Sequence, residues 1–363
     1  MRSNANEKDE VFRVCLFWER EAESEDEEGR LHAGMQARLS RLMRSNANEK
    51  DEVFRVGLFA EREAESGEER TEMQAIEVEN LSKTFRVKRK EKGMRGSIKA
   101  VLHPRIEEIR AVNGVSFSVE EGEMLAFIGP NGAGKSTTIK MLTGILYPDG
   151  GKVEVMGIDP TKKRRQLAYQ IGTVFGQKEQ LWTHLTPYDN FRFFGAIYDL
   201  SEKETEARIG ELAERFELAA FIDTPVRNLS LGQRIRCEIV ASLIHKPKVL
   251  FLDEPTIGLD PVVKENVREL IKQMNREEHT TIFLTSHDVG DIEKLCRRII
   301  IVNAGQIVQD DSVEHLVSHY LDKSPADMQA HDRACGVETG NGEPSAPTLE
   351  EIIVDIYKSK EDC

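Results

Sequence analysis

The alternation of apolar and polar stretches along most of the chain predicts an α/β fold. Met124–Ile128 and Val249–Leu252 are short apolar runs, and the length and composition of each are those of a buried strand. Between such runs lie longer amphipathic stretches. In Arg234–His245, for example, apolar residues recur every three or four positions, as on one face of a helix. Strands that alternate with helices in this way predict a mainly parallel sheet.

The first 72 residues follow a different pattern. Met1–Val14 and Met43–Val56 are identical in sequence, and this stretch of the chain holds 12 basic and 19 acidic residues. Acidic runs of this kind leave little apolar surface to bury. We predict that residues 1–72 form a leader that is disordered or is not native coding sequence, with Met73 as the natural start. A regulatory or docking arm is the alternative.

The end of the chain predicts a linker and a terminal helix. Ser324–Pro347 contains Pro, Gly and Ser, and Leu349–Lys358 places its apolar residues on one helical face. We expect this helix to pack back on the preceding domain rather than to bind a separate partner. The predicted organisation is therefore a leader (1–72), one domain (73–320) with a helical part at about 178–245, and a linker with a helix (321–363).

Composition excludes several classes of protein. The formal charge of −14 disfavours non-specific nucleic-acid binding, so no nucleic-acid partner is expected. No apolar run reaches the ~20 residues that cross a bilayer, and the start lacks a secretory signal. The five cysteines are scattered without CxxC spacing, which argues against a disulfide framework or zinc site and suits a reducing cytosol. We expect a soluble protein that would need a partner to work at a membrane.

A glycine-rich loop follows the first of the two predicted strands. Gly129–Ser136 fits the pattern G-x-x-x-x-G-K-[ST] at every fixed position. Glycines let successive backbone N–H groups turn toward phosphates. Lys135 supplies a positive charge for the β- and γ-phosphates, Ser136 can hold Mg²⁺, and a helix from about Lys135 directs its positive end to the same anion.

Two further groups of polar residues suggest nucleotide hydrolysis. Asp253 and Glu254 follow the second strand: Asp253 fits a Mg²⁺ ligand, direct or through water, and Glu254 can polarise the water that attacks the γ-phosphate. Ser230–Gln233 can cap the helix that follows and present N–H groups to an anion. Taken alone, this turn is an ordinary helix N-cap.

Together these motifs resemble the ATP-binding cassette (ABC) family over roughly Ile76–Gly305. The resemblance implies a P-loop NTPase fold of the ABC type, with a mainly parallel sheet core, an antiparallel β subdomain and a helical signature subdomain. It implies that Gln177 contacts Mg²⁺ and the attacking water, that His287 holds the γ-phosphate and that Asp260 couples two sites. Phe85 takes the adenine-stacking position, where Tyr is usual.

The resemblance, together with the motifs, gives a full set of expected site residues. The expected catalytic residues are Glu254, His287 and Gln177. The expected ligands of Mg²⁺ are Ser136, Gln177 and Asp253. The residues expected to contact ATP are Phe85, Gly129, Pro130, Asn131, Gly132, Ala133, Gly134, Lys135, Ser136, Thr137, Ser230, Gly232, Gln233 and Asp260.

Two features depart from the family pattern. Leu231 stands where the signature usually has its first glycine. The stretch Arg86–Arg110 is an insert with nine basic and three acidic residues. We interpret it as a solvated loop beside the adenine site, with a patch for anionic lipid headgroups as the alternative. The insert, Phe175–Lys178 and the signature resemble a bacterial subgroup of ABC-2-type exporters.

The function implied is that of an ATP-hydrolysing exporter subunit. Two cassettes, most simply a homodimer, would enclose two ATP molecules and drive separate membrane permease subunits from the cytoplasmic face. The alternative is a non-transport ABC ATPase that acts as a regulatory or translation-associated factor. Translation-type members carry two cassettes in one chain, whereas this chain has one phosphate loop, and a regulatory module without turnover would lack Glu254.

Overall fold

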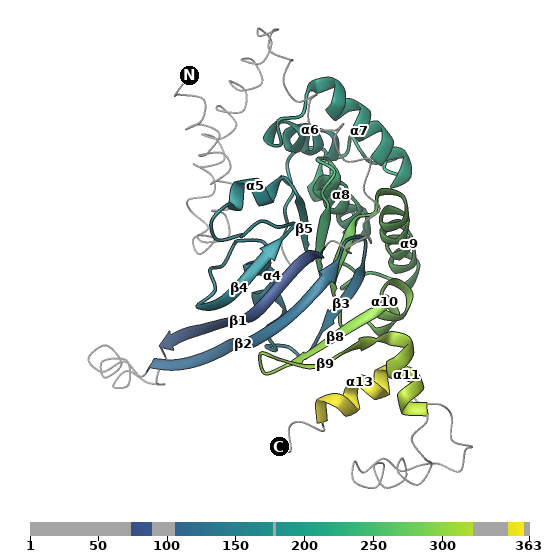
Figure 1. Ribbon diagram of the computed structural model, residues 1–363. Coiled ribbons are helices and arrows are strands. Elements are labelled where there is room, and N and C mark those ends of the chain that lie inside the picture. The colour runs from purple at the N-terminus through teal and green to yellow at the C-terminus, as the bar shows by residue number, and fades with distance from the viewer. Residues whose placement is uncertain (1–73, 89–105, 177–178, 322–347, 359–363) are drawn as a thin grey trace, which may run out of the picture. The chain divides into compact units, whose positions relative to one another are not determined.

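The computed structural model describes residues 74–88, 106–176, 179–321 and 348–358 (Figure 1). Two compact units divide the chain, and the first, Met1–Thr71, lies outside the described residues, so the description below concerns the second unit alone. The predicted leader, the predicted linker Ser324–Pro347, the middle of the insert and Gln177 also lie outside them.

A six-stranded sheet forms the centre of this unit. Its order is β5 (Ile171–Phe175), β6 (Val249–Asp253), β7 (Thr281–Thr285), β3 (Met124–Ile128), β8 (Arg298–Asn303) and β9 (Gln306–Ser312). The first five strands are parallel, and β9 returns antiparallel to β8. The expected mainly parallel core is confirmed. Because the strands are parallel, their carboxyl ends meet at one edge of the sheet.

A second, three-stranded sheet is antiparallel, as expected. Its order is β2 (Ile106–Glu120), β1 (Gln74–Lys88) and β4 (Gly150–Val155). The interpretation of Arg86–Arg110 as a loop is wrong at both ends, because residues 86–88 and 106–110 are strand. Arg86 pairs with Glu108 across these strands, and their side chains form an ion pair of 3.0 Å. The cross-strand hydrogen bonds thus continue into the basic insert.

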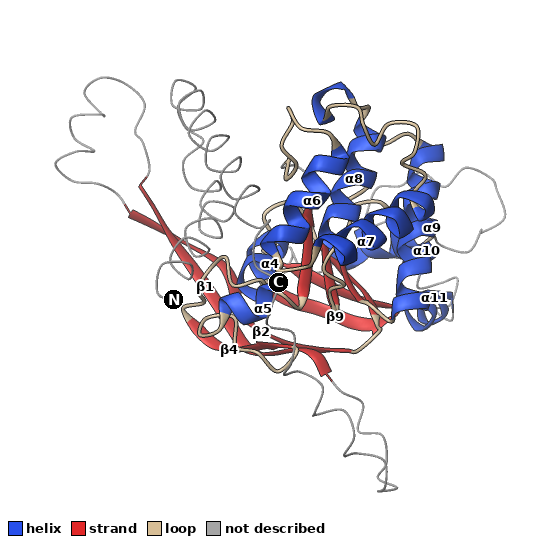
Figure 2. Ribbon diagram, turned by 90° about the horizontal axis from the view of Figure 1, so that it is seen from above, coloured by secondary structure: helices blue, strands red, loops and turns tan. Residues whose placement is uncertain are grey.

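Helices lie beside both sheets, and three of them form a separate helical part (Figures 1 and 2). The helical part consists of α6 (Pro187–Ile197), α7 (Glu202–Arg215) and α8 (Leu231–Leu243). The other α-helices are α4 (Lys135–Leu142), α5 (Arg164–Ala168), α9 (Pro261–Glu278), α10 (Val289–Leu295), α11 (Val313–Leu321) and α13 (Leu349–Lys358). Within the described ranges, no helix combines the length and apolar character needed to span a membrane.

The central sheet separates two apolar clusters. Successive strand residues face opposite sides, so Leu250 and Leu252 of β6 join one cluster while Val249 and Phe251 join the other. The first cluster also contains the helical part and the apolar face of α13. Four side chains of α13 are at most 7% exposed: Leu349, Ile352, Ile353 and Ile356. The terminal helix therefore packs on the core of this unit.

Candidate nucleotide site

The topology of the sheet brings distant parts of the sequence together. In the sheet, β3 and β6 both flank β7. The glycine-rich loop follows β3, Asp253 is the last residue of β6, and Ser286 and His287 follow β7. Three of the predicted motifs thus meet at the carboxyl edge of three adjacent parallel strands. Such an edge is where open α/β sheets bind their ligands.

Backbone close approaches explain the glycines of the loop. A Cβ atom on Gly129 would lie 2.3 Å from the Val302 carbonyl oxygen, and one on Gly134 would lie 2.2 Å from that of Ala111. Gly134 also has a φ of +104° and is the N-cap of α4. No side chain of the described residues caps this helix, so its first N–H groups are available to an anion.

The Lys135 side chain is buried against the backbone of this loop. Its Nζ donates to the backbone oxygens of Gly129 at 2.5 Å and Pro130 at 3.3 Å, and the residue is 6% exposed. Burial lowers the pKa of Lys135, and the nearby carboxylates of Glu254 and Asp253 partly offset this effect. The side chain is thus held where an added anion would favour its charged form.

The other residues of the loop differ in exposure. Ala133 is buried, Pro130 and Thr137 are half-buried, and Asn131, Gly132 and Ser136 are exposed.

Asp253 and Glu254 are both held by contacts with Thr285 of β7, the first through its carboxylate and the second through its backbone. Thr285 Oγ1 donates to Asp253 Oδ1 at 2.5 Å, and the Glu254 N–H donates to the Thr285 carbonyl oxygen at 3.0 Å. Glu254 has a φ of +55°, in the left-handed region that a non-glycine residue rarely adopts. Neither this conformation nor the role of Thr285 was predicted, because both depend on the register in which Asp253 pairs with Thr285.

His287 joins the carboxylate of Glu254 to the phosphate loop. Its Nε2 lies 2.9 Å from Glu254 Oε1 and 3.2 Å from Lys135 Nζ. The Glu254 carboxylate and the Lys135 ammonium group therefore both contact one imidazole nitrogen. Ser136 and Asp253 add a hydroxyl and a carboxylate, which are the hard oxygen donors that Mg²⁺ prefers. The site can thus bind phosphates, hold Mg²⁺ and activate a water molecule.

The signature residues form a helix start at another place. Ser230 caps α8 in a reciprocal pair: Gln233 N–H donates to Ser230 Oγ at 3.2 Å, and Ser230 N–H donates to Gln233 Oε1 at 2.9 Å. A Cβ on Gly232 would lie 2.6 Å from Val263 of α9. Ser230 is thus the N-cap of α8, which begins at Leu231. Among the described residues, no hydrogen bond joins this turn to the phosphate loop.

Two other predicted residues lie on separate elements. Asp260 is the N-cap of α9 and accepts from the N–H groups of Val262 and Val263, each at 3.1 Å. Phe85 lies on β1, is 37% exposed and pairs with Ile109 of β2. Its sheet adjoins the phosphate loop, because β2 also supplies the Ala111 carbonyl oxygen next to Gly134.

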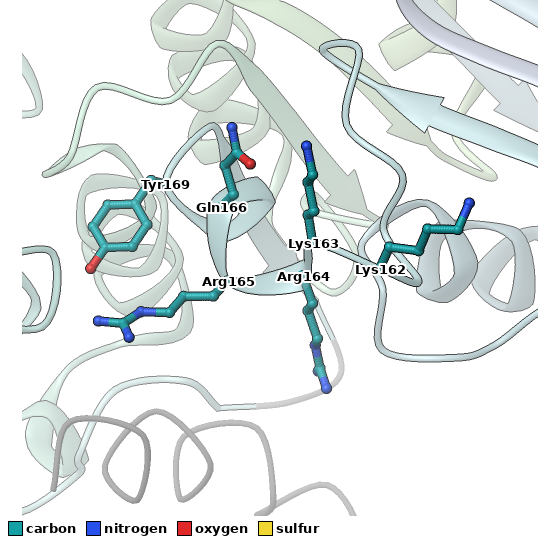
Figure 3. A pocket seen from close by; sticks show the side chains of 6 residues that line it. All are labelled: Lys162, Lys163, Arg164, Arg165, Gln166 and Tyr169. Carbon is teal, nitrogen blue, oxygen red and sulfur yellow. The ribbon is translucent and has the colours of Figure 1, made fainter. Parts of the chain in front are cut away.

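A basic hollow at α5 is not part of this site. Lys162, Lys163, Arg164, Arg165, Gln166 and Tyr169 line it, and none of them was a predicted site residue. Figure 3 shows the side chains of Lys163 and Arg164 pointing in opposite directions, while those of Lys162 and Arg165 diverge. Charges that do not converge cannot enclose one anion.

Comparisons with known proteins place the chain among nucleotide-binding transporter subunits. The family described as "ABC transporter" matches residues 112–257. The chain is 35% identical over 208 residues to the ABC transporter ATP-binding protein NatA of Bacillus subtilis, covering 57% of this chain and 84% of NatA. It is 36% identical over 212 residues to the daunorubicin resistance ATP-binding protein DrrA3 of Streptomyces coeruleorubidus. This similarity covers 58% of this chain and 66% of DrrA3.

A solved structure supports the fold. The dimeric ATP-binding cassette MJ0796, bound to ADP and phosphate, is similar with a TM-score of 0.55 and 26% identity. The similarity covers 66% of this chain and 98% of that one.

Proposed function

Because the chain belongs to the family of ABC transporter ATP-binding proteins, we propose that it hydrolyses ATP at this edge of the sheet to drive an exporter through separate membrane subunits. The observation that carries the proposal is the meeting of Lys135, Glu254 and His287 around one imidazole nitrogen. These groups can bind a phosphate, activate water and sense the terminal phosphate at a single point.

The chemistry follows from the positions of the chain's own groups. Lys135 and the N–H groups of the loop and α4 bind the β- and γ-phosphates. Ser136 and Asp253 would hold Mg²⁺, which neutralises phosphate charge when bound. Glu254 accepts the proton of the attacking water. His287 exchanges its contact with Glu254 for the γ-phosphate, which frees the base when substrate arrives.

The proposal of export rests on the named relatives. Resistance to daunorubicin appears in the name of one of them, DrrA3. We place this chain at the cytoplasmic face of a membrane, bound there by permease subunits. Co-purification with a candidate permease, and stimulation of ATP hydrolysis when both are present in lipid discs, would test this part. A chain that hydrolyses ATP but never associates with the permease would contradict it.

We further propose that two subunits form each site. The Ser230 turn contacts α9 of its own chain rather than its own phosphate loop, and the related cassette MJ0796 is a dimer. The turn is thus free to complete the site of a second copy. Phe85 would stack on the adenine, and Asp260 would couple the two sites.

Mixed dimers test this arrangement. A Lys135→Ala subunit is combined with a Ser230→Glu subunit, whose added carboxylate suits a helix N-terminus but repels a partner's phosphate. The mixed dimer then has one site with both defects and one with neither. Each variant alone should be inactive, and the mixture should recover single-turnover hydrolysis. If verified mixed dimers stay inactive, the model in which each site is shared between two subunits and can act on its own is contradicted.

A further inference from the structure

A buried carboxylate lies behind the nucleotide site and outside every role assigned above. Asp291 of α10 has no exposed surface and accepts three hydrogen bonds. Its Oδ2 accepts from Thr256 Oγ1 at 2.5 Å and from Ser286 Oγ at 2.6 Å, and its Oδ1 accepts from Arg268 Nε at 2.7 Å. All three donors are themselves buried, with at most 7% exposure.

The three donors belong to the segments that carry the reacting groups. Thr256 lies two residues after Glu254, and Ser286 directly precedes His287. Arg268 lies on α9, the helix that Asp260 caps. One carboxylate therefore joins the end of the β6 segment, the end of the β7 segment and the helix that follows the coupling residue.

The surrounding groups make this junction rigid. Arg268 Nη2 also contacts Asp288 Oδ1 at 3.2 Å, and Asp288 forms an ion pair with Lys264 at 2.5 Å. Ser286 Oγ, which donates to Asp291, also accepts from the Asp288 N–H at 3.0 Å. Asp288 and Lys264 are partly exposed, whereas Asp291 and its three donors are buried. Because the buried members are all paired, a displacement of any of them leaves a buried charge or donor without a partner.

We propose that Asp291 is a positioning residue for ATP hydrolysis, which fixes the Glu254 and His287 segments relative to each other. The inference rests on the proposed function. The Glu254 and His287 side chains must separate when ATP enters, yet both must then act on the same phosphate. Their backbone segments stay tied to one carboxylate, so the side chains reorient from fixed starting points. A displacement of about 1 Å between reacting groups can lower a rate on the order of 100-fold.

Substitutions that keep shape and remove single contacts test the proposal in the full chain. Asp291→Asn keeps the size of the side chain and removes its charge. Thr256→Val removes one hydroxyl at constant volume, whereas Thr256→Ser retains it. We expect kcat to fall about tenfold or more in Asp291→Asn and severalfold in Thr256→Val. The Kd for ATP should change less than about threefold, and Thr256→Ser should keep the wild-type kcat, because its hydroxyl still reaches Asp291.

A matched control separates positioning from general stability. Glu278 at the opposite end of α9 forms ion pairs with Arg208 at 2.9 Å and with Arg215 at 2.8 Å. Glu278→Gln therefore breaks a partly buried ionic network far along the same helix. Melting temperatures are measured for all variants, and kcat is compared between variants of equal thermal stability. Glu278→Gln should retain kcat.

The outcomes are distinguishable. A wild-type chain that does not hydrolyse ATP would overturn the proposed function itself. An active wild type with unchanged kcat in Asp291→Asn would overturn only the positioning role. The positioning role would also be overturned if kcat fell equally in Asp291→Asn and Glu278→Gln at equal thermal stability. If Asp291→Asn does not fold, Thr256→Val decides: loss of kcat with retained ATP affinity and rescue by Thr256→Ser supports the role, and wild-type kcat overturns it.

Discussion

Glu254 has an unusual backbone conformation, and its side chain contacts His287. From these two features we predict how Glu254→Gln affects folding, ATP binding and hydrolysis. Its φ of +55° depends on hydrogen bonds to Thr285. Gln has the same shape and the same backbone cost, so Glu254→Gln should fold and bind ATP. It cannot accept the proton of water, and we expect hydrolysis to fall by ~10²–10⁴-fold. Steady-state hydrolysis and nucleotide affinity are the measurements.

Lys135→Ala is the contrasting variant. It removes the buried ammonium group next to the loop carbonyls, so ATP affinity itself should fall. Near-normal hydrolysis by Glu254→Gln would exclude Glu254 as the base, whatever Lys135→Ala does.

Glu238 on α8 should make stability depend on pH. Burial raises the pKa of its carboxyl to about 7, while Arg234 and the backbone N–H of Gln180 favour the charged form and Glu179 opposes it. The folded-state pKa is above the ordinary 4.5, so folding favours the protonated form. This contribution is fully present below pH 4.5 and is lost as the pH rises through about 7.

We therefore expect Glu238→Gln to remove a pH-dependent loss of stability. The shift corresponds to about 3 kcal/mol in the free energy of unfolding across this range. Urea unfolding of wild type and variant at pH 5, 7 and about 8.5 measures the difference. If the free energy of unfolding depends on pH in the same way in both proteins, folding does not raise the pKa of Glu238.

At the scale of elements, α13 offers a test of packing. Ile352 is 1% exposed and Val354 on the same helix is 42% exposed. Ile352→Ala removes buried methyl groups and should lower the free energy of unfolding by about 2–5 kcal/mol. Val354→Ala should change it by less than about 0.5 kcal/mol. Chemical denaturation midpoints give both values, and equal effects would mean that α13 does not pack on the core.

The sequence predicted elements better than their boundaries and contacts. The strands around Met124–Ile128 and Val249–Leu252 followed from apolar runs, and the phosphate loop followed from glycine spacing. The strand ends of the insert did not, because polar residues such as Arg86 and Glu108 become strand only through pairing across the hairpin. Local pattern does not contain that register.

The candidate site divides in the same way. The motifs containing Lys135, Glu254 and His287 were visible in the chain, but their meeting around one nitrogen depends on the order of strands β6, β7 and β3. Asp291 gave no signal at all, since a single acidic residue on a short helix is ordinary. Only folding brings Thr256 and Ser286 to it.

For the whole molecule, we predict that a chain starting at Met73 suffices. Among the residues that the structure describes, the two apolar clusters begin at Ala75. The preceding 72 residues are acidic and duplicated. The shortened chain should therefore match the full chain in melting temperature and in rate of ATP hydrolysis. A loss of several degrees, or of most activity, would show that the leader is an integral part of the protein.

The position of the site on the sheet has a consequence for local unfolding. Strand β7 is buried along its whole length, and β3 and β6 pair with it on either side. Amide hydrogens in the middle of such a sheet exchange with solvent only when the whole domain opens, whereas those of peripheral helices exchange in smaller events. Asp253 is the last residue of β6, and His287 lies two residues beyond the end of β7. The phosphate-binding edge should therefore persist while outlying helices open and close.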